Sequence, residues 1–113
     1  MKAIKAIVQP FKVSAVVDAL EVLPGVGGIT TMDVRGFGHQ RGGSGLEHRA
    51  FGSLNYTPKV MLLIVVADDR VDDVLETIQR HAHTGNVGDG KVFVSPVDDA
   101  LRVRTGERGL GAL

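Results

Sequence analysis

Apolar and polar positions repeat along this chain with two periods, and the order of these periods predicts its elements. Residues expected to form strands, by alternation or by a short apolar run, are 2–8, 29–36, 59–67 and 92–94. Apolar side chains at i, i+3, i+4 and i+7 predict helices that begin near Val13 and Val71 and end near Leu23 and His83. The predicted order is strand, helix, strand, long loop, strand, helix, strand.

This order is typical of an α+β fold of the ferredoxin-like kind, in which two βαβ halves form one antiparallel sheet with both helices on one face. Residues 60–66 are continuously apolar, which favours burial of that strand on both faces. Since the sequence predicts no third helix to cover the second face, a closed assembly of several copies is expected to cover it. The 113 residues are enough for a single domain, 1–113.

The composition argues against some classes of binding partner. Thirteen basic residues balance thirteen acidic ones, so no overall field attracts nucleic acid or an anionic membrane. No apolar run approaches the ~18 residues that a membrane span needs, and cysteine is absent. We therefore expect a cytoplasmic protein with no nucleic-acid partner and no membrane insertion.

A glycine-rich run at residues 84–91 is the main candidate for binding chemistry. Gly85, Gly88 and Gly90 precede Lys91, and such turns let consecutive N–H groups approach an anion. Downstream, Arg102 and Arg104 are two residues apart, so in extended backbone both would leave the same face. The combination favours a polyphosphate site over its alternatives, an ordinary tight turn and a solvated basic surface. The spacing is not that of a Walker A loop, because Val92 follows the lysine where a hydroxyl residue is required.

The predicted loop at 38–58 is longer than most connections and holds five glycines and two histidines. We interpret it as an interaction arm that orders when a ligand or partner binds, although its basic residues could simply be solvated. A metal site at His39 and His48 is a minor alternative, which no ligand spacing supports.

Several motifs resemble those of the PII signal-transduction proteins, which sense nitrogen and energy state. They are residues 1–4, 9–12, 36–38, 58–60, 84–94 and 102–106. The stretch from Thr84 to Val94 fits that family's signature position by position. The resemblance implies a homotrimer that binds ATP or ADP competitively in clefts between subunits, with Mg²⁺ accompanying ATP, and a long T-loop at 38–58 that engages a protein target such as a transporter or metabolic enzyme.

The resemblance also assigns site residues. Phosphates would be held by Gly88, Asp89, Gly90 and Lys91, with Arg102 and Arg104 from the neighbouring subunit. The base and ribose would be surrounded by Ile7, Thr30, Gly36 and Val65, with Gly38 also at the nucleotide. Gln40 and Lys59 occupy the positions that contact 2-oxoglutarate beside MgATP, a role that suits an amide oxygen near a hard cation and an ammonium near a carboxylate.

Departures from the family pattern lie mostly in the loop. Gly52 stands where the family's uridylylated tyrosine should be, so uridylylation is not expected, and His39 replaces an arginine. On the third strand, Leu63 replaces a glutamate that many members have near the nucleotide.

The leading hypothesis is therefore a regulator in nitrogen control, with no catalytic or metal-binding residues. The first alternative is a divergent trimer that regulates another transporter or a metal-related process without sensing 2-oxoglutarate. A small ATPase is a third class, which we disfavour because no base or water-positioning residue stands out.

Overall fold

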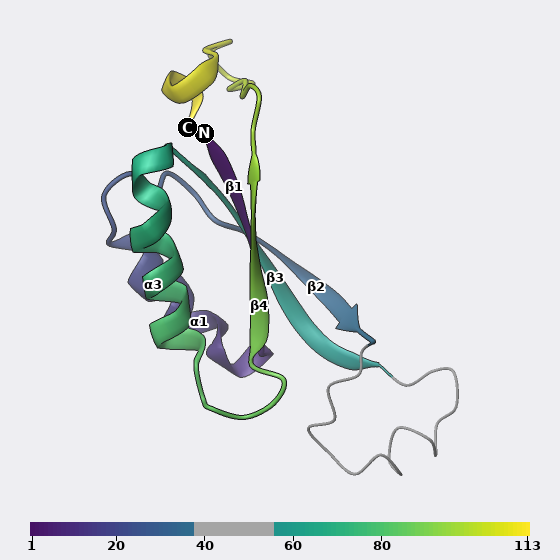
Figure 1. Ribbon diagram of the computed structural model, residues 1–113. Coiled ribbons are helices and arrows are strands. Elements are labelled where there is room, and N and C mark those ends of the chain that lie inside the picture. The colour runs from purple at the N-terminus through teal and green to yellow at the C-terminus, as the bar shows by residue number, and fades with distance from the viewer. Residues whose placement is uncertain (38–55) are drawn as a thin grey trace.

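The computed structural model in Figure 1 describes residues 1–37 and 56–113. Its strands are β1 (Lys2–Val8), β2 (Thr30–Gly36), β3 (Thr57–Val66) and β4 (Gly90–Pro96). Its two α-helices are α1 (Val13–Glu21) and α3 (Val71–Ala82), each entered through a short 3₁₀ turn. The strands form one antiparallel sheet in the order β2-β3-β1-β4. Both helices lie on the same side of it (Figure 1), which confirms the predicted ferredoxin-like fold.

Most predicted boundaries agree with the structure within about two residues. β3 begins at Thr57 and β4 at Gly90, each two residues earlier than expected. The first helix ends at Glu21, two residues before the expected end. The two strands start earlier because pairing recruits flanking residues that have no strand pattern of their own: Thr57 and Pro58 pair with β2, and Gly90 pairs with Val8 of β1.

One face of the sheet packs on the helices and forms the core. Buried side chains of α1 and α3 contact the buried side chains of β1 and β3. Each of these elements has one row of apolar side chains on this side, because the helical period is 3.6 residues and the strand period is two. The buried residues of this cluster are Ile4, Ala6, Val8, Val16, Leu20, Val60, Leu62, Ile64, Val66, Val74, Ile78 and Ala82.

The other face, called here the open face, has no helix of the described residues on it. Alternate residues of β3, namely Met61, Leu63 and Val65, are only half-buried there. In the single chain β3 is buried on one face, because both helices lie on the same side of the sheet; burial of its other face by another copy stays a prediction. An apolar row remains available for contact with another molecule.

Strand register decides which segments share an end of the sheet. Val8 pairs with both Val60 and Gly90, so the start of β3 and the turn before β4 lie at one end. Lys2 pairs with Pro96, so the segment after β4 begins at the opposite end (Figure 1). Among the described residues, no helix has the length and apolarity required to cross a membrane.

Candidate functional site

The turn before β4 is organised around the side chain of Asp89. Its carboxylate accepts hydrogen bonds from the Thr84 N–H at 2.7 Å, the Gly85 N–H at 2.9 Å and the Thr84 hydroxyl. The hydrogen bonds from Thr84 are the main cause that lowers the Asp89 pKa to about 2. The Asn86 N–H donates to the Thr84 hydroxyl oxygen at 3.1 Å. The N–H groups of Thr84, Gly85 and Asn86 are therefore all used within the turn itself.

Three glycines of the turn adopt backbone conformations that disfavour side chains. Gly85 has φ +90°, Gly88 has φ +100° and Gly90 has φ +117°. A Cβ at Gly90 would overlap the main-chain oxygen of Ile7 and lie 2.9 Å from its carbonyl carbon. Glycine at position 90 thus lets the turn close directly onto β1.

Lys59 connects the start of β3 to this turn. Its amine donates to the main-chain oxygen of Gly88, and the Gln9 amide donates to the same oxygen at 3.0 Å. The side chain is only 9% exposed, and burial lowers the pKa of Lys59, opposed by the nearby charge of Asp89. A cation is therefore held between the base of the 38–55 segment and the glycine turn.

The residues expected around the base and ribose share the open face. Ile7 pairs with Met61 on one side and Lys91 on the other, Thr30 pairs with Leu63, and Val65 pairs with Ala3. Directly paired residues of an antiparallel sheet project to the same side, and residues two apart on one strand do so as well. Ile7, Thr30 and Val65 therefore lie on one face together with Lys59 and Lys91. Gly36, at the end of β2, belongs to the same alternating set.

Two predicted site residues, Gly38 and Gln40, lie outside the described residues. The same holds for His39, His48 and Gly52, on which the expectations about metal binding and uridylylation depend. The T-loop prediction for residues 38–58 overlaps the structure only at its last three positions, where Tyr56 precedes β3.

The extended backbone that would put Arg102 and Arg104 on the same face is interrupted between them. Residues 103–105 form a turn, with the Gly106 N–H donating to the Arg102 oxygen at 2.8 Å. Hydrogen bonding between the backbones of Arg102 and Glu107 bends the chain, which the alternation of Arg and Val side chains does not reveal. The Arg102 side chain also pairs with the Glu107 carboxylate at 2.8 Å and with the main-chain oxygen of Leu113 at 3.0 Å.

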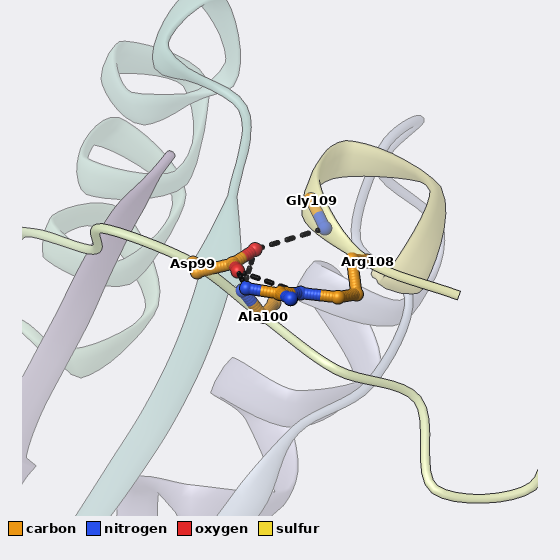
Figure 2. A network of polar contacts seen from close by, with 4 residues as sticks. All are labelled: Asp99, Ala100, Arg108 and Gly109. Carbon is orange, nitrogen blue, oxygen red and sulfur yellow. Dashed lines mark hydrogen bonds and ion pairs between the residues drawn. The ribbon is translucent and has the colours of Figure 1, made fainter. Parts of the chain in front are cut away.

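A polar network fixes the stem of this hairpin. Figure 2 shows Asp99 accepting hydrogen bonds from the Ala100 N–H at 2.9 Å, the Gly109 N–H at 3.2 Å and the Arg108 guanidinium, at 2.8 Å from Nε. The contact with Arg108 is the main cause that lowers the pKa of Asp99. The segment that carries Arg102 and Arg104 follows Pro96, which pairs with Lys2, and so lies at the end of the sheet opposite the glycine turn (Figure 1). One chain does not bring these arginines to Lys91.

Sequence reasoning missed the roles of Gln9, Asp99 and Arg108. Gln9 lies 79 residues from its partner Gly88, and Arg108 lies nine residues from Asp99. A local pattern contains no signal for contacts of this kind, because they depend on how strands and turns come together.

Comparison with known proteins agrees with this architecture. The family model described as nitrogen regulatory protein P-II matches residues 1–107. The chain is 45% identical to a nitrogen regulatory protein P-II of Bradyrhizobium diazoefficiens and 44% identical to one of Azospirillum brasilense. It is 41% identical to the nitrogen regulatory protein GlnK of Escherichia coli K12. Each match covers 100% of both chains. The fold, the glycine turn and these full-length matches together show that the chain belongs to the nitrogen regulatory protein P-II family.

Proposed function

We propose that this protein is a nitrogen-regulatory signal transducer of the cytoplasm that binds ATP or ADP in clefts between the subunits of a homotrimer. The observation that carries the proposal is the shared open face of Ile7, Thr30, Val65 and Lys91, which ends at a turn closed by Gly90. Apolar and hydroxyl side chains suit a base and ribose, while Lys91 and the turn suit phosphates.

A cleft between subunits is supported by two features of the single chain. Arg102 and Arg104 lie at the end of the sheet opposite the glycine turn, so only another copy can present them to phosphates held there. The half-buried row of Met61, Leu63 and Val65 gives a second copy an apolar surface to cover. Both features are satisfied at once by a closed ring of copies.

A dicarboxylate such as 2-oxoglutarate is the expected second ligand. Lys59 already holds a buried positive charge next to the glycine turn, and its pKa is lowered because burial leaves that charge poorly solvated. A carboxylate at this point would supply the counter-charge. Gln40 would join it, and Mg²⁺ bound with ATP would neutralise part of the phosphate charge.

The output is control of a partner protein, a transporter or a metabolic enzyme, through the T-loop. β2 and β3 lead directly into that segment, and Lys59 at its base touches the glycine turn. Ligands shift the loop between states only by the difference in their affinity for those states. We expect no catalysis, because regulation requires binding alone.

Titration calorimetry with ATP, ADP and adenosine tests the proposal, with light scattering to give the mass of the assembly. We expect binding of ATP and ADP to a trimer, and loss of most of the affinity in Lys91→Ala. Lys12→Ala, on the 3₁₀ turn before α1, is the control. Absence of nucleotide binding at millimolar concentration, or a monomer, overturns the proposal.

A second titration separates the leading function from its alternative. We expect 2-oxoglutarate to strengthen MgATP binding and Lys59→Met to abolish that effect. If 2-oxoglutarate changes nothing in the wild-type chain, the protein is instead a divergent regulator of another transporter or of a metal-related process.

A further inference from the structure

The open face carries three lysines and no carboxylate on its strands. Lys5, Lys59 and Lys91 belong to the alternating positions that project there, as the register shows. The other strand residues of this face are apolar, hydroxyl-bearing or glycine. If a second copy covers this face, each lysine there needs an anion beside it, because an ammonium group that loses water is otherwise left uncompensated.

Two of these lysines already have an assigned role. The amine of Lys59 donates to the Gly88 oxygen, and Lys91, which follows the glycine turn, is the lysine that the proposed function assigns to phosphates. Lys5 has none: it is exposed, and its direct cross-strand neighbours are Leu63 on β3 and Phe93 on β4. Among residues 1–37 and 56–113, no ion pair or side-chain hydrogen bond involves Lys5.

The position of Lys5 relative to Lys91 identifies its partner. Lys91 is paired with Ile7, two residues along β1 from Lys5, so the two lysines are diagonal neighbours on one face. Diagonal neighbours have Cα atoms about 7–8 Å apart, within reach of long side chains. Two ammonium groups at this separation repel one another, and a multivalent anion placed between them attracts both.

We propose that Lys5 is a further phosphate-binding residue of the nucleotide site, acting with Lys91 on the polyphosphate tail. This inference rests on the proposed function and adds a residue to its site. The alternative partner is an acidic side chain from another copy; the strands of the open face offer none, and a partner from elsewhere would leave the reactivity of Lys5 unchanged by ATP. Lys5 therefore raises affinity for ligands with more phosphates and does little for the nucleoside.

Lys5→Met is the informative variant, since it removes the charge and keeps an apolar side chain beside Leu63 and Phe93. Lys2→Met is the matched control, because Lys2 lies on the same strand at the helix-facing set of positions. We expect Lys5→Met to weaken ATP binding about 10-fold, as for the loss of one charge-assisted hydrogen bond. The binding of ADP should be weakened less, and the binding of adenosine not at all. The affinity of Lys5→Met for ATP should depend less on salt than that of the wild-type chain.

Several outcomes decide between the proposals. If the wild-type chain binds no nucleotide, both the proposed function and the role of Lys5 fall. If it binds ATP and Lys5→Met binds equally well, only the role of Lys5 falls. The role of Lys5 is also overturned if Lys5→Met weakens the binding of ATP and of adenosine equally, or if it changes only the mass of the assembly.

A labelling experiment on the wild-type chain tests the role of Lys5 without requiring that a variant folds. Amine acetylation followed by mass spectrometry should show Lys5 and Lys91 protected by ATP and not by adenosine. Lys2 should react equally with and without ATP. Lys5 that stays equally reactive in the ATP complex contradicts the proposal.

Discussion

The amine of Lys59 donates a hydrogen bond to the main-chain oxygen of Gly88, 29 residues away, and so ties the base of the 38–55 segment to the glycine turn. Gln9 donates to the same oxygen from the end of β1. The contact gives a physical route by which a ligand at the turn is felt at the start of β3.

Removing this contact should loosen the turn and leave the fold intact. In Lys59→Met, one hydrogen bond worth about 0.5–1.5 kcal/mol is lost, so amide exchange at residues 87–90 should rise about 2- to 10-fold. The free energy of unfolding should change by less than about 1 kcal/mol, because burying the ammonium was itself costly. Hydrogen exchange followed by mass spectrometry checks this, and unchanged exchange at the turn would contradict it. Lys12→Met is the control.

Gly90→Ala should be strongly destabilising. The new Cβ would overlap the Ile7 oxygen, and φ +117° is unfavourable for any L side chain. We expect a loss of about 3 kcal/mol or more in the free energy of unfolding. Gly28→Ala is the matched control, because nothing lies within 4 Å of its Cβ position. It should change the free energy of unfolding by no more than about 0.5 kcal/mol. Urea unfolding at one fixed protein concentration makes the comparison, and equal effects of both variants would refute the close approach.

Stability should fall on acidification, in part through Asp89. Its folded pKa of about 2 is below the ordinary value of 3.8, so its contribution is full above about pH 4. The contribution is lost as the pH falls towards 2, because a protonated carboxyl group is a weaker acceptor for the Thr84 and Gly85 N–H groups. Urea unfolding between pH 5 and 2 should show a shallower decline for Asp89→Asn than for the wild-type chain, since the amide does not titrate. An identical pH profile for both would contradict this role.

Glu107→Gln should release Arg102 for a ligand. The 2.8 Å ion pair is partly exposed, and such pairs contribute about 0–1 kcal/mol. If phosphates must displace Glu107 from Arg102, the variant should bind ATP up to about 5-fold more tightly. Calorimetry measures this, with Glu76→Gln on α3 as the control. Weaker binding by Glu107→Gln would show that Glu107 positions Arg102 for the ligand.

The sequence by itself determined the elements, the fold class and the glycine turn. Strand and helix periods are local, so the alternation of β1 and the stripe of α1 could be read without tertiary information. Glycines at 88 and 90 before Lys91 likewise predicted a tight turn, because positive φ is a local demand of the backbone.

Only the tertiary structure decided which side chains share a face and an end of the sheet. Strand register, which depends on pairing between distant segments, brought Lys5 diagonal to Lys91 and Lys59 onto Gly88. It also separated Arg102 from the glycine turn, and backbone hydrogen bonds form a turn between Arg102 and Glu107. Local periodicity specifies elements, whereas binding sites arise from contacts between residues far apart in the chain, and these exist only once the chain has folded.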